Sequence, residues 1–451
     1  MAQAHNSFSL ANPHPTGMDT IQKIAAAVGG LGLLVLFIAL CGQINGDYAT
    51  WLAVSLTLMA AGVCVYAWRE YEGKPEGIKN NHVWHRALTN RGLWAWVVGV
   101  VLTGFYLVLY FRAEYLGLGE SGAANTGLIA LFDPLSQFLK NEPASQWFVY
   151  GVLYTLAILI FGVKFLLKYR HNRYQQFRTL SVMFFQLGFA FLIPEILMRL
   201  NYPYNNFTNM WPLNYYFFDG WSIEAMTTSG KVGMFMLVWG ILMIFVISPV
   251  LTYFYGKRWY CSWVCGCGGL AETAGDPFRH LSDKSLNAWK LERWMIHGVL
   301  VFAIVMTLMV LIFNNGTLRS WYGVAIGSMF SGVIGVGFYP IFGSRVWCRF
   351  GCPMAAILGL QQRFFSRFRI TTNGGQCISC GNCSTYCEMG IDVRSYAQKG
   401  QNIVRASCVG CGICAAVCPR GVLRLENSAI DINARTDEMK VIMISEDGVR
   451  I

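Results

Sequence analysis

Eight cysteines near the C-terminal end of the chain have the spacing that most clearly predicts chemistry. Each of two runs reads C-x2-C-x2-C-x3-C, and Pro419 follows the second. In such paired runs, the fourth cysteine of each run ligates the [4Fe–4S] cluster held by the other. We therefore expect one cluster on Cys377, Cys380, Cys383 and Cys418, and a second on Cys408, Cys411, Cys414 and Cys387. A zinc or disulfide module is the alternative, but zinc sites usually pair C-x2-C with a distant partner set.

Four further cysteines form two C-x3-C pairs. Cys261 and Cys265 lie in RWYCSWVCGCGGL, and Cys348 and Cys352 lie in RVWCRFGCPMAA. On a helix, residues i and i+4 share a face, so both sulfurs of each pair could point to one centre. Four soft ligands suit an iron–sulfur cluster or zinc. Three interpretations stay open: a third metal or iron–sulfur centre, redox-active dithiols, or structural thiols, since buried free cysteine is common.

The composition predicts that most of the chain is embedded in a membrane. The 451 residues are 55% hydrophobic and only 13% charged, whereas soluble proteins contain about 25% charged residues. Apolar runs of about 18 residues or more predict transmembrane helices. We count eight: Ile21–Gln43, Thr50–Trp68, Leu93–Phe111, Trp147–Leu167, Leu180–Leu200, Val232–Tyr255, Trp294–Phe313 and Val324–Phe342.

The predicted fold is therefore mostly α. We expect a tail at residues 1–20, a polytopic transmembrane helical bundle at 21–365 with C-x3-C motifs at the inner ends of helices six and eight, and an α+β domain carrying the two clusters at 366–451.

Basic residues concentrate in alternate connections, at 69–91, 168–178, 257–290 and 345–369. The stretches 43–49 and 201–230 contain no Lys or Arg. Because such residues mark cytoplasmic loops, we expect both termini and the cluster domain on the cytoplasmic side of a bacterial inner membrane. These loops, facing anionic headgroups, account for the net charge of +11, so we expect no nucleic-acid partner.

The two C-x3-C motifs, followed by the eight-cysteine domain, resemble membrane iron–sulfur (polyferredoxin) proteins of the NapH and NosR type. The resemblance covers about residues 237–420 and implies a bacterial-ferredoxin-like fold for the cluster domain. It also implies a quinol-linked or ferredoxin-linked redox protein that serves a respiratory enzyme. One departure concerns the proline that usually follows the second cysteine. Pro353 follows Cys352, but Gly266 and Cys267 follow Cys265, so the partner of Cys261 is either Cys265 or Cys267.

Other residues have both a functional and a structural interpretation. Glu195 is either a proton acceptor or quinone-site residue, or forms a helix-end ion pair with Arg199. His297 either hydrogen-bonds a quinone or is satisfied between helices. The aromatic stretch 201–230 either caps the bundle or docks a redox partner. We expect no haem, because there is no C-x-x-C-H motif and only His297 lies in a predicted helix.

The sequence thus predicts an electron-transfer subunit of a quinol-linked oxidoreductase, joined in a complex with other electron-transfer proteins. Its cofactors would be two [4Fe–4S] clusters and, on the open interpretation, a third centre and a quinone. An accessory factor that assembles or reactivates a metalloenzyme is one alternative. A membrane redox sensor is another. The direction of electron flow does not follow from cysteines alone.

Overall fold

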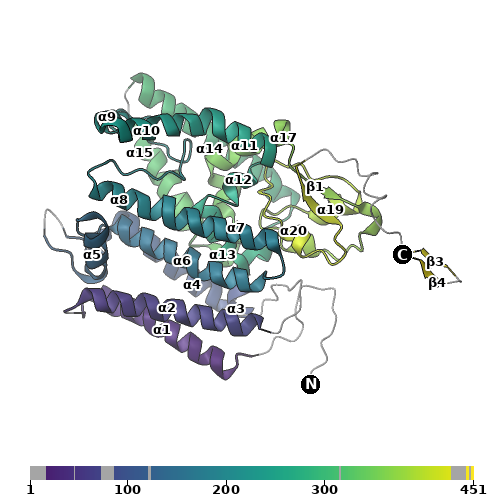
Figure 1. The fold of residues 1–451 in the computed structure, drawn as a ribbon, viewed down its shortest axis with the longest axis horizontal. Coiled ribbons are helices and arrows are strands. Elements are labelled where there is room, and N and C mark those ends of the chain that lie inside the picture. The colour runs from purple at the N-terminus through teal and green to yellow at the C-terminus, as the bar shows by residue number, and fades with distance from the viewer. Residues whose placement is uncertain are drawn as a thin grey trace.

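The computed structural model describes residues 17–44, 46–72, 86–119, 123–313, 316–427, 443–445 and 448–450. The expected tail at 1–20 and the stretch 428–442 of the predicted cluster domain therefore lie largely or wholly outside the described residues. Figure 1 shows long helices lying side by side, with the cysteine-rich part of the chain at one end of the bundle. We call this part, residues 366–427, the ferredoxin-like region.

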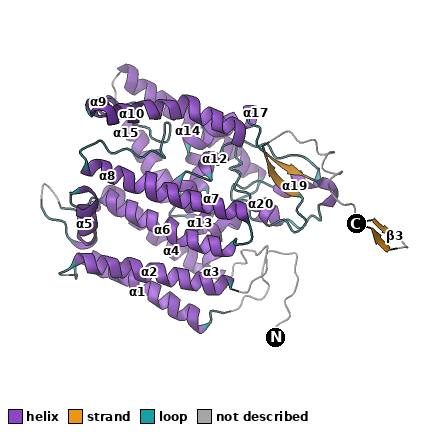
Figure 2. Cartoon of the chain, viewed as in Figure 1, coloured by secondary structure: helices purple, strands orange, loops and turns teal. Residues whose placement is uncertain are grey.

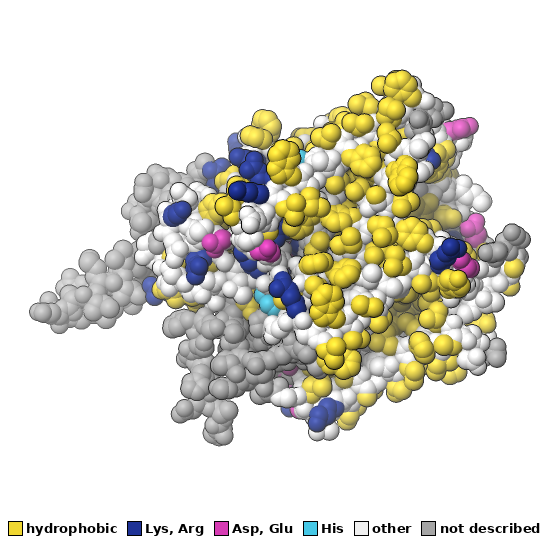
Figure 3. Space-filling model, turned by 180° about the vertical axis from the view of Figure 1, so that it is seen from behind, with side chains coloured by type: hydrophobic (Ala, Val, Ile, Leu, Met, Phe, Trp, Pro, Cys, Tyr) yellow, Lys and Arg dark blue, Asp and Glu magenta, His cyan; other side chains and the backbone are white. Residues whose placement is uncertain are grey.

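Seven helices in the described part are long and apolar enough to cross a membrane, which identifies a multi-pass membrane protein by length and composition. They are α1 (Thr20–Leu40), α2 (Tyr48–Tyr71), α4 (Leu93–Phe111), α6 (Gln146–Lys168), the run α7, η2 and α8 (Arg173–Phe184, Phe185–Leu192 and Ile193–Arg199), the run α10, η3 and α11 (Gly230–Leu242, Met243–Ile247 and Ser248–Tyr255), and α14 (Leu286–Phe313). The prediction of a polytopic helical bundle is confirmed. Figure 3 shows apolar side chains covering much of one face of this bundle.

The predicted eighth span, Val324–Phe342, is wrong in its position. The chain instead forms α15 (Thr317–Tyr322) and η5 (Gly323–Ile334), turns, and then forms the short α16 (Tyr339–Phe342). Glycines in η5 accommodate aromatic rings: a Cβ at Gly332 would lie 2.6 Å from the Tyr110 ring. Because glycine and polar residues replace larger apolar ones here, this helix is not among the seven apolar spans.

Small residues also set the packing of α1 on α2. A Cβ at Gly62 would lie 2.6 Å from the backbone nitrogen of Gly29, so only glycine permits this approach. Ser55 donates a hydrogen bond to the Gly32 carbonyl at 2.8 Å nearby. Close helix approach at glycine and serine is the usual mode of packing in membranes, where apolar burial between helices contributes little.

Shorter helices connect the spans and shape the end of the bundle near the ferredoxin-like region. They are α3 (Arg86–Thr89), η1 (Ala113–Leu116), α5 (Gly127–Lys140), α9 (Gly220–Thr228), α12 (Arg258–Cys261), α13 (Gly266–Thr273), η4 (Asp276–Leu281), η6 (Trp347–Gly351) and α17 (Pro353–Phe365). Among them, α5 packs a buried apolar face against the bundle at the end opposite the ferredoxin-like region.

The aromatic stretch after α8 enters the bundle and does not lie wholly on its surface. We call residues 201–219 the re-entrant segment. Trp211 donates its indole N–H to Thr307 Oγ1 of α14 at 2.9 Å, and Tyr260 donates its hydroxyl to the Thr208 carbonyl at 2.8 Å. Met210 is 2% exposed. Irregular backbone is tolerated at membrane depth where protein surrounds it, as here.

Two short strands close the ferredoxin-like region (Figure 2). Strand β1 (Arg369–Thr372) pairs antiparallel with β2 (Leu423–Glu426), with Arg369 opposite Glu426. Between them lie η7 (Gly374–Gln376), α18 (Asn382–Thr385), α19 (Val393–Gln398) and α20 (Ile413–Ala416). A separate hairpin, β3 (Met443–Ser445) with β4 (Gly448–Arg450), follows. Because β1 precedes the first cysteine run and β2 follows the second, their pairing holds both runs within one small fold.

Candidate metal centres

The eight cysteines of the ferredoxin-like region surround two separate cavities. The first cavity is lined by Cys377, Cys380, Cys383 and Cys418, and the second by Cys387, Cys408, Cys411 and Cys414. Each cavity thus takes three cysteines from one run and the fourth from the other, which is the grouping expected from the spacing. The turns leading into α18 and α20 contain Gly381 and Gly412 with φ of 79° and 76°, a conformation that favours glycine.

Backbone amides and burial determine the chemistry of these thiols. The amide of Ile391 donates to Cys387 Sγ at 3.3 Å. Burial raises the pKa of Cys408 to about 11 and that of Cys411 to about 12. A buried thiol of this kind stays protonated at neutral pH unless a metal takes the place of the proton. Four converging sulfurs with amide donors around a small cavity fit a [4Fe–4S] cluster.

The two cavities differ in their access to solvent. Cys380 of the first cavity is exposed, whereas Cys408 and Cys414 of the second are buried. The second cavity lies against the membrane domain: Gln175 and Tyr174, at the start of α7, hydrogen-bond the carbonyls of Cys411 and Gly410. The second cavity is therefore the inner of the two.

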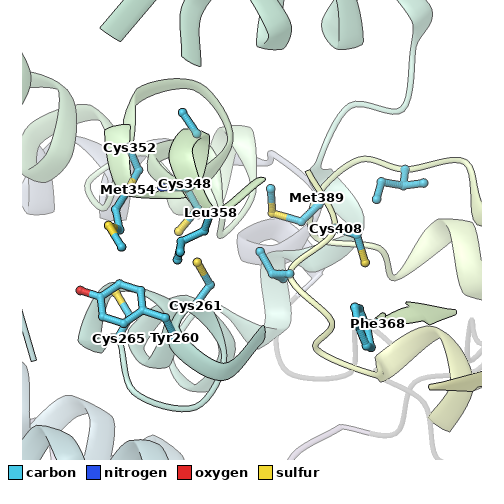
Figure 4. Close-up of a cluster of buried hydrophobic side chains, with 14 of the residues drawn as sticks. Tyr260, Cys261, Cys265, Cys348, Cys352, Met354, Leu358, Phe368, Met389 and Cys408 are labelled. Atoms are coloured by element: carbon cyan, nitrogen blue, oxygen red, sulfur yellow. Dashed lines mark hydrogen bonds between the residues drawn. The ribbon is translucent and has the colours of Figure 1, made fainter. Parts of the chain in front are cut away.

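The C-x3-C cysteines come together behind this second cavity. All four are buried, with exposed fractions of 5% to 8%, in the same core cluster as Cys408. Figure 4 shows Cys261 and Cys265 facing Cys348 and Cys352 across the space between the α12–α13 segment and the η6–α17 segment. We call these four the membrane-side cysteines.

The predicted i,i+4 arrangement on one helix is wrong for both pairs, although the sulfurs still converge. Cys261 ends α12 while Cys265 is the N-cap of α13, and Cys348 lies in η6 while Cys352 is the N-cap of α17. The chain turns between the two cysteines of each pair. As a result, the positive ends of two helix dipoles point at the site, and the Ala355 amide donates to Cys352 Sγ at 3.4 Å.

Cys267 lies beside the membrane-side cysteines. It is half-buried, whereas Cys265 is buried with the other three. A hydrogen bond from the Cys267 side chain lowers the pKa of Cys265 to about 7. Cys265 is thus buried with the other three membrane-side cysteines, and Cys267 is hydrogen-bonded to it.

A buried chain of ion pairs, which the sequence analysis did not predict, links the membrane domain to the ferredoxin-like region. Glu272 pairs with Arg178 and Arg345, and Glu388 pairs with Arg345 at 3.0 Å and with Arg279 at 2.7 Å. The Arg345 guanidinium also lies 3.6 Å from Cys348 Sγ, while Glu388 follows Cys387 directly in sequence. One guanidinium–carboxylate pair therefore connects the membrane-side cysteines with the second cavity.

The chain of ion pairs ends at Asp276. Its carboxylate accepts from Arg279 at 2.8 Å and from Lys168 at 2.7 Å, and Lys164 lies at 3.8 Å. These cations keep the pKa of Asp276 well below its usual range despite burial. Lys168 and Arg178, which the basic-loop pattern places toward lipid headgroups, are in fact buried in this network.

Lys257 is a second link between the membrane-side cysteines and the second cavity. It is 0% exposed, and its ammonium donates to the carbonyls of Ala355 at 3.4 Å and Ala406 at 2.7 Å. It forms no ion pair with a carboxylate in the described residues. Its positive charge lowers the otherwise raised pKa of both Cys261 and Cys408. A buried ammonium without a carboxylate is costly unless negative charge lies nearby, as metal-bound thiolates would supply.

The remaining predicted residues lie apart from these centres. Glu195 pairs with Lys140 of α5 at 3.7 Å, while Arg199 donates to the Phe138 carbonyl, so the expected Glu195–Arg199 ion pair is wrong. Lys140 is the last residue of α5, a helix that the sequence did not predict, which explains the error. His297 lines a cavity between α14, α17 and the ferredoxin-like region.

Comparisons with known proteins agree with this geometry. Residues 376–423 match a family described as a 4Fe-4S dicluster domain. Residues 237–285 and 324–371, which contain the two C-x3-C motifs, each match a family described as a 4Fe-4S binding domain. Iron–sulfur binding and an electron-transport role are thereby supported, and the chain fits a membrane polyferredoxin.

Three curated proteins are similar over part of the chain. One is named "Putative electron transport protein YccM", from Escherichia coli (strain K12), and is 24% identical over 40% of this chain and 56% of its own length. MauN of Paracoccus denitrificans, a methylamine utilization ferredoxin-type protein, is 29% identical over 38% of this chain and 57% of its own. The uncharacterized MJ0749 of Methanocaldococcus jannaschii is 28% identical over 33% and 58%. The chain thus spans a little over half the length of these relatives, and no solved structure matched it.

Proposed function

We propose that this protein relays electrons through [4Fe–4S] clusters between the quinone pool, or a cytoplasmic donor, and a respiratory redox partner. The observation that carries the proposal is the order of three four-cysteine sites. The first cavity reaches the surface at Cys380, the second is buried against the membrane domain, and the membrane-side cysteines lie in the same core cluster behind it. Such a series suits stepwise electron transfer between the protein surface and the membrane.

In this proposal each cavity holds one cluster on the four cysteines that line it. When bound, a [4Fe–4S] cluster supplies one-electron chemistry; the chain supplies thiolates, amide donors and exclusion of water. The Ile391 amide and the burial of Cys408 and Cys414 would tune the inner of the two clusters.

The membrane-side cysteines are proposed to hold a third iron–sulfur or metal centre, with Cys265 and not Cys267 as the fourth ligand. Convergent buried sulfurs, two helix N-termini and the buried ammonium of Lys257 all favour negative charge at this place. Neutral structural thiols would leave Lys257 without nearby negative charge. The arrangement therefore favours a metal-bound site over the dithiol and structural interpretations.

The proposed orientation places both termini and the ferredoxin-like region in the cytoplasm of a bacterial cell, with the bundle in the inner membrane. It is supported by the basic connections at the end of the bundle that carries this region. A protease added outside intact cells should leave the C-terminal part uncut, whereas cleavage there would contradict the orientation.

Reduction by quinol tests the function. The full chain, purified without oxygen and placed in lipid nanodiscs, should show loss of visible cluster absorbance and gain of EPR signal when quinol is added. A variant lacking the first cavity, Cys380→Ser with Cys383→Ser, should still accept electrons but pass them more slowly to an added soluble acceptor. If quinol never changes the spectrum, while a partner enzyme lacks its metal in cells without this protein, the accessory-factor alternative is correct.

A further inference from the structure

A cavity of about 190 Å³ opens where α14, α17 and the loop before Cys408 meet. Its walls include Trp289, Arg293 and His297 of α14, Arg363 of α17, and Arg405 and Ser407 of the ferredoxin-like region. None of these side chains has a role in the proposed metal centres. We call it the interfacial cavity, because it lies between the membrane domain and the ferredoxin-like region.

Three guanidinium groups give this cavity a positive charge that the described residues do not neutralise. Arg293 and Arg405 lie over the Trp289 ring, 5.1 Å and 4.9 Å from its centre, and Arg363 also lines the wall. None of the three forms an ion pair within the described part of the chain. The lining residue Glu292 does not compensate them, since Arg349 holds its carboxylate at 2.6 Å.

Exposed apolar side chains follow two of the cavity's arginines directly in the sequence. Trp294 follows Arg293 and is 81% exposed, and Phe364 and Phe365 follow Arg363 and are 67% and 70% exposed. Such side chains are stable at a surface that faces lipid, with tryptophan favouring the headgroup level. Figure 3 shows basic side chains gathered where the apolar face of the bundle meets the ferredoxin-like region. The ligand should therefore carry an anionic group for the cavity and an apolar part for the exposed apolar side chains of the same two helices.

We propose that the interfacial cavity binds the phosphate headgroup of an acidic phospholipid, with the acyl chains lying along Trp294, Phe364 and Phe365. Basic pockets at the membrane surface bind such headgroups, and each nearby Lys or Arg strengthens the attraction. A quinone ring is uncharged and gives no reason for three unpaired guanidinium groups. Because Arg405 and Ser407 immediately precede Cys408, the bound headgroup would hold the loop of the second cavity against the membrane. This inference does not depend on the proposed electron transfer.

Lipid retention by the full chain tests the proposal. The protein is placed in vesicles of phosphatidylcholine with a small fraction of spin-labelled phosphatidylglycerol or, separately, of spin-labelled phosphatidylcholine. We expect an immobilised component with a clear preference for phosphatidylglycerol. The double variant Arg363→Gln with Arg405→Gln should lose that preference by about fivefold for each arginine removed. Iron content and cluster absorbance of each variant report whether the protein still folds.

The matched control is Lys290→Gln with Lys399→Gln, which removes two exposed charges that do not line the cavity. It should keep the preference for phosphatidylglycerol. Equal retention in the double arginine variant and the wild type, with both folded, would overturn the proposal. Displacement of the labelled lipid by millimolar inorganic phosphate would identify a free-phosphate site instead, and displacement by a quinone but not by unlabelled phosphatidylglycerol would identify a quinone site. Either result rejects the lipid.

Discussion

The ferredoxin-like region and the membrane-side site present four cysteines to a common point in different ways. In the ferredoxin-like region, short loops with left-handed glycines bring together cysteines from two runs. At the membrane-side site, two helix N-caps, the last residue of α12 and a residue within η6 bring together cysteines 87 residues apart, at Cys261 and Cys348. The loop sites can form within one small fold, whereas the membrane-side site requires the bundle to be assembled.

The first cavity and the membrane-side cysteines also differ in the charges that surround them. The first cavity reaches solvent, whereas the membrane-side cysteines are surrounded by buried charges, with Arg345 and Lys257 closest. At a loop site that reaches the surface, water can screen the negative charge of metal-bound thiolates. At a buried site it cannot, so the protein must supply fixed countercharges. Fixed countercharges therefore accompany the membrane-side cysteines, whereas solvent can screen charge at the exposed Cys380 of the first cavity.

The largest expected effect comes from removing a cysteine that completes the other run's cavity. Cys387→Ser should abolish the cluster of the second cavity and spare the first, lowering the iron content by about four per chain. EPR of the reduced variant checks which signal disappears. Loss of the first-cavity signal alone would show that the lining cysteines are not the ligands.

Cys348→Ser should act only on the membrane-side site. If a [4Fe–4S] cluster is bound there, iron falls from about twelve to about eight per chain, while both ferredoxin-like signals remain. The control is Cys267→Ser, which should keep the full iron content because Cys265 is the converging thiol. An iron content of about eight in the wild type, with no zinc, would reject the third centre. If Cys267→Ser loses iron and Cys265→Ser does not, then Cys267 and not Cys265 is the fourth ligand of this centre.

Breaking the buried ion network should have a smaller, structural effect. Asp276→Asn leaves Lys168, Arg279 and Lys164 without their shared carboxylate and should cost about 3–5 kcal/mol of unfolding free energy. The exposed pair of Glu114 with Arg112 is the matched control, and Glu114→Gln should cost less than about 1 kcal/mol. Thermal unfolding in detergent compares the two. Equal melting temperatures would mean that the network is not stabilising.

The smallest expected effect is a change of reduction potential. Lys257→Gln removes a positive charge beside Cys261 and Cys408, so the reduced, more negative clusters lose stabilisation and their midpoint potentials should fall. Lys257→Arg should restore most of the potential if space permits. The exposed Lys399→Gln should cause no shift, because solvent screens its charge. Redox titration followed by EPR measures the midpoint potentials of all three variants. Unchanged potentials in Lys257→Gln would show that Lys257 does not set them.

Long apolar runs and regular cysteine spacing were sufficient to predict the helical bundle and the grouping of the eight cysteines. Both depend on local patterns: Leu93–Phe111 is identical in the prediction and the structure. The missed features depend on partners distant in sequence. The helix α5 is short and amphipathic, and its Lys140 reaches Glu195, a contact that no local pattern records.

The same reason explains the errors elsewhere. For the aromatic stretch 201–230 the sequence left open whether it caps the bundle or docks a redox partner. The contacts of Thr208 with Tyr260 and of Trp211 with Thr307, which no local pattern records, bring part of it into the bundle. The sequence left Cys265 and Cys267 as alternatives because its glycine-rich stretch did not determine where α13 begins; in the structure Cys265 is the N-cap of this helix. One local signal for the ion network is present in the sequence: Glu272 and Asp276 are acidic residues within the otherwise basic connection 257–290.

Each of the two ferredoxin-like cavities takes cysteines from both runs, and this constrains when the clusters can be assembled. The first cavity is incomplete until Cys418 has been synthesised, and the second needs Cys414 as well as Cys387. Translation reaches these residues only after all seven apolar spans have left the ribosome. Both sites can therefore be completed only after these spans have been made, so cluster assembly follows the synthesis of the membrane domain.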